Sequence, residues 1–231
     1  MKICTFNIWN ADTNFNKRLE LLVKEISNHS IDILALQEVK NETTFNHIKT
    51  KTEFEYGFYY EGLAFLSNYE IKEYEKSNKD NNFILRVVYK DSSFTNVHLD
   101  WKNKETRVIG IDTYYDMLEK NAFENEFLLG DFNNIPEDQL HFDLVMSDYT
   151  DIHQTYSHSI NELPLPTLDM DNNPRWRNHK TDEVPCRFDW IMLNTIKDFN
   201  INEVKLVGTE EVNGITPSDH YGIISDIDID L

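Results

Sequence analysis

The sequence predicts an α/β fold in which two mixed β-sheets pack face to face beneath helices. Apolar runs with the length of buried strands recur along the chain, and segments with helical spacing separate several of them. Other neighbouring runs are joined by tight turns, which indicates hairpins in addition to crossovers. The 231 residues suit one large domain, so residues 1–231 are expected to form a single unit.

The first half of the chain alternates strands and helices. Leu19, Leu22 and Ile26 recur at helical spacing behind Asp12 and Asn14, and either of these polar residues is suited to cap a helix. The expected elements are a strand at 2–8, a helix from Asp12 or Asn14 to about 27, a strand at 31–37, a polar helix at roughly 41–51, several short strands within 54–75, and a hairpin of strands 83–90 and 93–98.

The second half holds one further helix and a long irregular stretch. The apolar pattern is lost between about 148 and 184, where Pro164, Pro166 and Pro174 favour a long functional loop. In the last segment isoleucines alternate with aspartates, which is typical of a strand with one face in water. The expected elements are a helix at 103–120 and strands at 126–130, 187–193, near 203–208 and 222–231.

The acidic charge balance limits the substrates that suit the chain. Its 22 basic and 41 acidic residues give a formal net charge of −19. This charge disfavours non-specific binding to long nucleic acid, which depends on many Lys and Arg contacts to phosphate. A phosphate substrate remains compatible with it, because bound cations invert the local potential.

The sequence carries no pattern of export or membrane insertion. It lacks a stretch of about 18 apolar residues, so no membrane span is expected. The N-terminus lacks the regions of a secretory signal, which favours a cytoplasmic location. Cys4 and Cys186 are therefore expected to stay reduced, with Cys4 as a small core side chain. No protein partner is expected.

Polar residues follow the apolar runs at the point where each run ends. Because ligands gather at the carboxyl ends of strands in layered α/β folds, these residues are expected to share one cleft. Carboxylates, amides and two imidazoles in such a cleft are suited to hold a hard divalent cation and to cut phosphate esters. The residues are Asn7, Gln37, Glu38, His98, Asp131, Asn133, Asp189, Asp219 and His220.

Six short motifs, taken in order, resemble those of a known superfamily. They are Phe6-Asn7, Gln37-Glu38, His98, Gly130-Asp131-Phe132-Asn133, Arg187-Phe188-Asp189-Trp190 and Ser218-Asp219-His220. Each motif alone is weak, but together they span residues 6 to 220 and resemble the endonuclease/exonuclease/phosphatase superfamily, which has the deoxyribonuclease-I-like fold. The resemblance implies a four-layer α/β sandwich, with two packed mixed sheets flanked by helices. It also implies Mg²⁺-dependent hydrolysis of phosphoester bonds, with Mn²⁺ as the alternative ion.

The resemblance assigns the metal site to three residues. Glu38 looks like the principal ligand, helped by Asn7 and Asp219. Mg²⁺ prefers carboxylate, amide and water oxygens at ~2.0–2.1 Å, so these residue types fit the ion. Structural alternatives stay open: Glu38 is also suited to stand at a helix N-terminus, and Asn7 to be a buried hydrogen-bonding residue.

The resemblance assigns the chemistry to five further residues. Asp131 looks like the group that orients or deprotonates the attacking water, with Asn133 beside it. His220 looks like the residue that binds the scissile phosphate and stabilises its developing charge, with Asp189 holding the ring. His98 looks like the second histidine, at the phosphate or the leaving oxygen. Phosphate diesters repel anionic nucleophiles, so catalysis needs such cations and donors around the phosphate.

Three of these residues also have structural alternatives. Asp131 is suited to cap a turn, and His98 to be a hydrogen-bonded core histidine. Asp189 is suited to pair with Arg187, which would not prevent it from orienting His220. The occurrence of the whole set in order favours the catalytic interpretation.

Two motifs depart from the family pattern. Leu66-Ser67 is followed by Asn68 where family members often carry arginine, so a positive charge near the rim of the cleft is missing. The inositol polyphosphate 5-phosphatase branch carries Trp-Cys before its aspartate and Arg after it. Residues 185–190 keep the Pro-to-Asp spacing but lack those neighbours, which argues against that branch.

A basic and aromatic segment, residues 174–180, stands out in the acidic chain. Arg grips phosphate in a fork geometry, and Trp stacks on a base or sugar. Arg175, Trp176 and Arg177 are therefore expected to form part of the substrate wall, and Trp101 is a second candidate for the rim. The alternative is a surface loop whose Trp packs down and whose charges are solvated.

These residues favour a metal-dependent phosphoric ester hydrolase, foremost a phosphodiesterase or nuclease acting on nucleic acid ends, nucleotides or a small phosphodiester. The alternative within this fold is a phosphomonoesterase of sugar, lipid-headgroup or nucleotide phosphates. A catalytically silent binding protein is a third hypothesis, since fold does not dictate function. The presence of both Asp131 and His220 argues against it. The expected partner is a phosphoester, with nucleic acid and nucleotides among the candidates.

Overall fold

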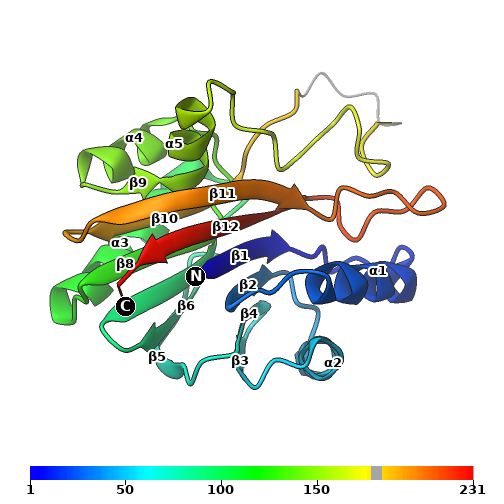
Figure 1. Cartoon of the computed structure of the whole chain (residues 1–231), viewed down its shortest axis with the longest axis horizontal. Coiled ribbons are helices and arrows are strands. Elements are labelled where there is room, and N and C mark those ends of the chain that lie inside the picture. Colours follow the sequence, from blue (N-terminus) through cyan, green and yellow to red (C-terminus); the bar gives the residue numbers. More distant parts are fainter. Residues whose placement is uncertain (178–183, 231) are drawn as a thin grey trace.

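Two six-stranded mixed β-sheets lie face to face at the centre of the structure (Figure 1). This computed structural model describes residues 1–177 and 184–230. The strand order is β11-β12-β1-β2-β4-β3 in one sheet and β5-β6-β7-β8-β10-β9 in the other. The first sheet contains β1 (Lys2–Asn7), β2 (Ile33–Gln37), β3 (Tyr56–Tyr60), β4 (Leu63–Ser67), β11 (Phe199–Val207) and β12 (Gly222–Ile229). The second contains β5 (Lys72–Lys79), β6 (Asn82–Tyr89), β7 (Ser92–His98), β8 (Asn125–Asp131), β9 (Thr150–Asp151) and β10 (Asp189–Thr195).

Helices cover the outer faces of the sheets, so the described chain forms the expected four-layer α/β sandwich. Helices α1 and α2 pack on the first sheet through side chains such as Leu22 and Ile48. Helices α3 and α4 pack on the second sheet through Tyr114 and Leu144, and α5 packs against β10 and β11. None of these helices has the length and apolar content needed to cross a bilayer. The helices are α1 (Phe15–Ser27), α2 (Glu42–Thr52), α3 (Lys104–Lys120), α4 (Gln139–Met146) and α5 (Ile152–Ser159).

An apolar core fills the space between the sheets. Ile3 and Phe65 of the first sheet belong to one buried cluster with Leu85, Phe127 and Ile191 of the second. The helices bury the opposite faces of both sheets, so strands such as β2 and β8 are buried on both sides. This double burial explains why their sequences are continuous apolar runs instead of alternating ones. Each fully buried aliphatic or aromatic side chain stabilises the fold by ~1.5–3 kcal/mol.

Most of the expected elements are present, with one region that differs. The hairpin predicted at 83–90 and 93–98 is the antiparallel pair β6 and β7. The continuous loop expected from about 148 to 184 is wrong at its start, because β9 and α5 lie there, and α4 was not among the expected elements. These helices are short, and their buried positions include polar residues such as His141, His153 and Ser157. A polar buried face leaves no apolar periodicity to detect.

The first helix begins after Asn14, one of the two expected cap residues, but Asn14 does not cap it through its side chain. Asn14 occupies the N-cap position in a left-handed conformation, with φ at 52°, and its side chain makes no capping hydrogen bond. The buried Arg18 guanidinium instead donates to carbonyl groups of the preceding loop, including those of Trp9, Ala11 and Thr13. Cys4 and Cys186 are not joined by a disulfide, and Cys4 is fully buried in the core, as expected.

Candidate active site

The ends of four strands and the start of a fifth meet at one edge of the sandwich. β1 and β2 are parallel partners, with Asn7 opposite Gln37 at their ends. β7 and β8 are parallel partners in the other sheet, with His98 opposite Asp131. β10 runs antiparallel to β8, so its first residue, Asp189, also lies opposite Asp131. The register therefore brings the polar strand-end residues into one region.

Asn7 connects the two sheets at this edge. Its Nδ2 donates to Asp131 Oδ2 at 2.8 Å and to Glu38 Oε1 at 3.3 Å. Its Oδ1 accepts a hydrogen bond from the Trp9 backbone N–H at 3.0 Å, and its carbonyl accepts one from Ser218 Oγ at 2.7 Å. Asn7 is buried, and all of its side-chain hydrogen-bonding groups are used. The contacts of Asn7 thus fix the Glu38 and Asp131 carboxylates relative to each other.

Glu38 and His98 lie together on the solvent side of the site. The Glu38 carboxylate also accepts a hydrogen bond from the Asn10 backbone N–H at 3.1 Å. His98 Nε2 lies 3.9 Å from Glu38 Oε1 and 3.8 Å from Asp131 Oδ2. The Glu38 and His98 side chains are 23% and 19% exposed, so a ligand can reach both from solvent.

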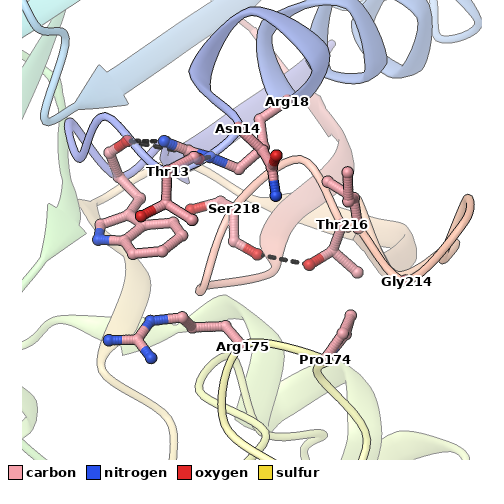
Figure 2. Close-up of a pocket in the computed structure, with 10 residues that line it drawn as sticks. Thr13, Asn14, Arg18, Pro174, Arg175, Gly214, Thr216 and Ser218 are labelled. Atoms are coloured by element: carbon pink, nitrogen blue, oxygen red, sulfur yellow. Dashed lines mark hydrogen bonds between the residues drawn. The ribbon is translucent and has the colours of Figure 1, made fainter.

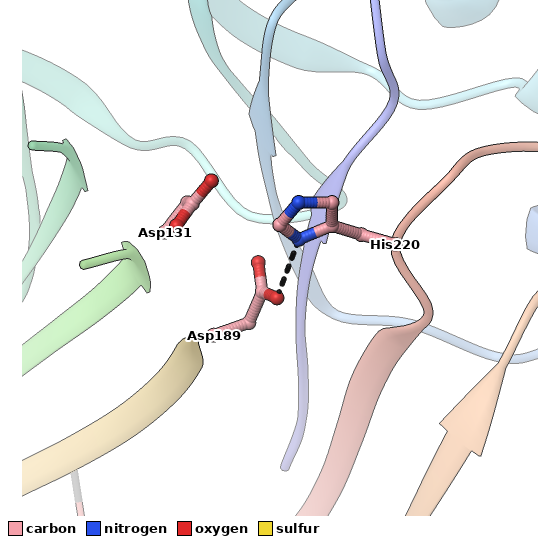
Figure 3. Close-up of side chains that lie close together, drawn as sticks. All are labelled: Asp131, Asp189 and His220. Carbon is pink, nitrogen blue, oxygen red and sulfur yellow. Dashed lines mark hydrogen bonds and ion pairs between the residues drawn. The ribbon is translucent and has the colours of Figure 1, made fainter. Parts of the chain in front are cut away.

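Asp131, Asp189 and His220 form a buried cluster next to this pair (Figure 3). His220 Nδ1 is hydrogen-bonded to Asp189 Oδ2 at 2.8 Å. Asp131 receives the backbone N–H of Asn133 on its second oxygen, also at 2.8 Å. One ligand-type atom of each cluster residue lies within 4.8 Å of the others. In this cluster Asp189 orients the His220 ring, and the Asp131 carboxylate lies close to both.

The charges of this cluster favour a protonated His220. Burial lowers the pKa of His220, but the carboxylates around it, first Asp189 and then Asp131 and Asp219, outweigh burial and raise that pKa well above its usual value. Burial raises the pKa of Asp189, against the opposing effect of His220. Burial, opposed by His220 and aided by the Glu38 charge, raises the pKa of Asp219 to about 6. An imidazolium held by a buried carboxylate is suited to receive an anionic oxygen.

The donor set around Glu38 fits a hard divalent cation. Glu38 and Asp219 supply carboxylate oxygens, and the Glu38 charge acts on the Asp219 carboxyl. Mg²⁺ prefers such ligands and keeps several waters, which the solvent-facing side of Glu38 permits. The cluster of Asp131, Asp189 and His220 also has ligand atoms of the right types. An ion among them would displace the hydrogen bond between His220 and Asp189, whereas an ion on the solvent-facing side of Glu38 would leave that bond in place.

Left-handed backbone conformations direct several side chains of the site. Trp9, Glu38 and Asn133 have φ values of 54°, 55° and 47°, and each lies within two residues of a strand end. Such values are uncommon for residues with a Cβ and cluster at functional sites. Gly130 has a φ of 139°, and a Cβ there would collide with the Val97 backbone. Glycine therefore permits the close approach of β8 to β7 one residue before Asp131.

Arg187 pairs with Asp151 and not with Asp189. Its guanidinium donates to both Asp151 carboxylate oxygens, at 3.1 and 2.6 Å, and both residues are buried. The structural alternative of a pair between Asp189 and Arg187 is therefore wrong. This buried ion pair anchors the segment just before β10, and Asp189 is left to His220.

Thr167 supports the site but was not among the predicted residues. Its Oγ1 accepts hydrogen bonds from the backbone N–H groups of Phe188 and Asp189, at 3.1 and 3.2 Å. Its carbonyl accepts one from the Tyr221 N–H at 2.7 Å. Thr167 thus ties the start of β10 to the segment that carries His220. It lies in the proline-interrupted stretch, where no local pattern distinguishes it from its neighbours.

The members of the basic and aromatic segment differ in their placement. Arg175 lines a cavity of about 300 Å³ beside the site (Figure 2). The Trp176 indole Nε1 donates to the Asp219 carbonyl at 2.9 Å, so this ring packs against the site. Arg177 forms an exposed, two-bond ion pair with Glu211, at 2.5 and 3.1 Å.

The second rim candidate lines another cavity. Trp101 is 66% exposed and borders a cavity of about 350 Å³ together with Glu38 and His98. Two cavities therefore adjoin the site, one lined by Trp101 and the other by Arg175. Residues 178–180, the rest of the basic segment, lie outside the described residues.

Comparison with known proteins links this geometry to one family. A sequence model described as the Endonuclease/Exonuclease/phosphatase family matches residues 4–220. The matched range contains every strand-end residue of the site. No curated protein matches the chain.

Solved structures of low sequence identity share the fold over its whole length. TDP2 from D. rerio, in a complex with a single-strand DNA product, has a TM-score of 0.76 and 21% identity, with 99% of each chain covered. An endonuclease/exonuclease/phosphatase family protein from Bacteroides thetaiotaomicron has a TM-score of 0.73 and 16% identity, covering 100% of this chain and 98% of that one. The mannosyl-6-phosphatase Bt3783 of the same bacterium has a TM-score of 0.71 and 17% identity, covering 99% of this chain and 100% of that one.

Proposed function

The chain belongs to the endonuclease/exonuclease/phosphatase family, and from this premise we propose that it is a Mg²⁺-dependent phosphoester hydrolase that cleaves phosphodiesters. The substrates that we propose are nucleic acid ends, nucleotides or a small phosphodiester. One observation carries the proposal. The Asn7 amide donates hydrogen bonds to both Glu38 and Asp131, and the hydrogen-bonded pair of His220 and Asp189 lies beside them. This arrangement supports a cation site next to an imidazole that binds the phosphate.

The cation is proposed to bind at Glu38 and Asp219, with Asn7 as the third predicted ligand. When bound, it supplies positive charge to the phosphate oxygens and to the water around them. Asn7 donates its amide protons to the Glu38 and Asp131 carboxylates and so holds Glu38 in place.

The chemistry is proposed to fall to the buried cluster and to His98. Asp131 orients the attacking water and accepts its proton, with the backbone N–H of Asn133 holding the other carboxylate oxygen. His220 donates from its protonated ring to a phosphate oxygen, and Asp189 fixes that ring through Nδ1. His98 lies between Glu38 and Asp131, where it reaches the phosphate or the leaving oxygen. A positioned base of this kind contributes ~10²–10⁴ in rate.

The two cavities favour a diester over a monoester. A diester carries two substituents on the scissile phosphate, and two separate cavities adjoin the site. Trp101 at one cavity and Arg175 with Trp176 at the other are the proposed substrate walls, and Arg177 supports the latter wall through its ion pair with Glu211. The net charge of −19 favours short or small substrates over long duplexes.

A phosphomonoesterase is the second candidate. Among the structural neighbours, TDP2 was crystallised with a single-strand DNA product and Bt3783 is a mannosyl-6-phosphatase, so this fold occurs both in a protein that binds DNA and in a sugar phosphatase. The distinction depends on the residues around the phosphate and not on the fold.

The test is hydrolysis with and without EDTA over a panel of phosphoesters. The panel holds bis-p-nitrophenyl phosphate, p-nitrophenyl phosphate, single-stranded oligonucleotides, plasmid DNA, sphingomyelin and sugar phosphates. We expect turnover that EDTA stops and Mg²⁺ restores, with bis-p-nitrophenyl phosphate preferred to the monoester. Preference for the monoester would favour the second candidate. A folded protein without turnover on any member would favour a silent binding protein.

A steep loss of plasmid cleavage with rising salt would indicate many phosphate contacts and a long substrate. A flat salt dependence is the result expected for a short one.

A further inference from the structure

The cavity that Arg175 lines has a charge character opposite to that of the whole chain. The described residues around it include Arg18 and Arg175 but no carboxylate (Figure 2). The chain as a whole carries nearly twice as many acidic as basic residues, 41 against 22. Two guanidinium groups thus line a cavity of an acidic chain, and their charge suits an anion.

Arg18 supplies a fixed positive charge to the wall of this cavity. It is 3% exposed, and its guanidinium donates to backbone carbonyls, among them Ile8 at 3.1 Å, Trp9 at 3.0 Å and Ala11 at 2.6 Å. These carbonyls satisfy its donors, and the charges of Asp219 and Glu38 also act on the guanidinium. Because the arginine side chain keeps its proton in proteins, its field acts permanently on the cavity.

Arg175 forms the opposite wall and is held by two aromatic rings. Its guanidinium carbon lies 5.1 Å from the Trp9 ring centre and 4.8 Å from the Trp176 ring centre. Contacts of this kind stabilise a cation by ~0.5–2 kcal/mol and restrict its position. A restricted guanidinium binds phosphate oxygens with two parallel hydrogen bonds.

The cavity adjoins the proposed cation site through Trp9 and Ser218, which both line it. The Trp9 N–H donates to Asn7 Oδ1, and Ser218 Oγ lies 3.2 Å from Asp219 Oδ1. Two residues that line the cavity therefore contact Asn7 and Asp219, which are proposed to hold the cation.

We propose that this cavity binds a second phosphate group of the substrate, adjacent to the scissile one. The inference rests on the proposed function and narrows its substrate class to phosphoesters that carry a further phosphate. That phosphate is either the next one along a nucleic acid strand or a separate phosphate of a small molecule. Arg175 grips it, and the Arg18 charge lowers the cost of bringing it close to the acidic site.

The test is calorimetric titration in EDTA, which needs no turnover. Thymidine 3′,5′-bisphosphate is compared with thymidine 5′-monophosphate, and we expect the bisphosphate to bind at least about tenfold more tightly, a gain of ~1.4 kcal/mol. Arg175→Gln is expected to remove this advantage, and Arg175→Lys to keep part of it. Lys120→Gln, which removes the same charge at the exposed end of α3, is the matched control and should retain the full advantage.

Equal affinity for the two nucleotides, no measurable binding of either, or an advantage that survives Arg175→Gln would overturn the proposal. Thermal unfolding shows whether Arg175→Gln is still folded. If it is not, the affinity of Arg175→Lys for the two nucleotides is the measurement that tests the role of Arg175. Hydrolysis of bis-p-nitrophenyl phosphate, which has no second phosphate, tests the proposed function separately.

Two further pairs of ligands distinguish the sources of the phosphate. The dinucleotide pTpT is compared with TpT, and fructose 1,6-bisphosphate with fructose 6-phosphate. An advantage for pTpT alone supports a strand phosphate, and an advantage in both pairs supports a small polyphosphorylated substrate. The absence of an advantage in both pairs contradicts the second phosphate site.

Discussion

Asp189 lies directly opposite Asp131 in the register between β10 and β8, and its Oδ1 atom is buried without a hydrogen-bond partner among the described residues. Two carboxylates are thus held side by side, while His220 bonds only one of them. Neighbouring buried carboxylates resist simultaneous ionisation unless a cation compensates them. The ring of His220, whose pKa the surrounding carboxylates raise, places a compensating positive charge beside this pair.

Replacement of Asp131 or of His220 is expected to reduce turnover strongly without unfolding the protein. Asp131→Asn removes the proposed base, and His220→Gln removes the phosphate donor. Each should lower kcat by ~10²–10⁴, the usual contribution of a positioned acid or base. The exposed substitution Asp143→Asn on α4 is the control for a lost carboxylate. Rates are measured on the best substrate of the panel, with circular dichroism to verify folding. Rates like those of the unmodified protein in both variants would remove the mechanism.

Glu38→Gln is expected to weaken Mg²⁺ binding. The substitution keeps the shape of the side chain but removes the charge that the cation site depends on, so the Mg²⁺ concentration for half-maximal activity should rise by at least ~10-fold. Saturating Mg²⁺ should restore part of the rate. Glu20→Gln, on the exposed face of α1, should leave the Mg²⁺ dependence unchanged. An identical Mg²⁺ dependence in both variants would place the cation elsewhere.

The fold could be predicted from the sequence where burial leaves an apolar signature. β2 and β8 are buried on both faces, and the continuous apolar runs that result are visible in the chain. α5 buries His153 and Ser157 instead, so it carries no apolar period and was interpreted as loop. The difference comes from the chemistry of the buried face and not from the length of the element alone.

The candidate site could be predicted only in part, for a similar reason. His98, Asp131 and Asp189 end or begin strands, and register alone brings them together. Thr167 acts through hydrogen bonds to backbone groups far along the chain, at Asp189 and Tyr221, and such contacts leave no local pattern. Tertiary contacts of this kind require the structure.

Thr167→Val is expected to lower kcat while KM changes little. Valine matches the shape of threonine but cannot accept the N–H groups of Phe188 and Asp189, so the carboxylate that orients His220 loses its support. Unpaired buried donors also cost ~1–3 kcal/mol of stability. Thr167→Ser keeps the hydroxyl and should restore most of the rate, which a purely volumetric effect would not do. Equal rates in the valine and serine variants would contradict this positioning role.

The stability of the fold is expected to fall as the pH is lowered from about 6.5 to about 4, in part through His153. This residue is 3% exposed on α5; its Nε2 accepts the Leu165 N–H at 3.3 Å, and its Nδ1 is buried without a hydrogen-bond partner among the described residues. Burial, aided by the Arg187 charge and opposed by Asp151, lowers the pKa of His153 to about 4.

The unfolded chain, with a histidine pKa of about 6.5, binds this proton more readily than the folded one. The stabilisation from a neutral His153 is therefore complete above that pH and is lost as the pH falls toward about 4, by up to ~3 kcal/mol. Urea unfolding at pH 7.5, 5.5 and 4.5 measures it. His153→Gln should flatten the loss, whereas the exposed His158→Gln on the same helix should not. Of these two histidines, only the buried His153 must be neutral in the folded chain. If the free energy of unfolding falls by the same amount between pH 7.5 and 4.5 in both variants, a group other than His153 causes the acid sensitivity.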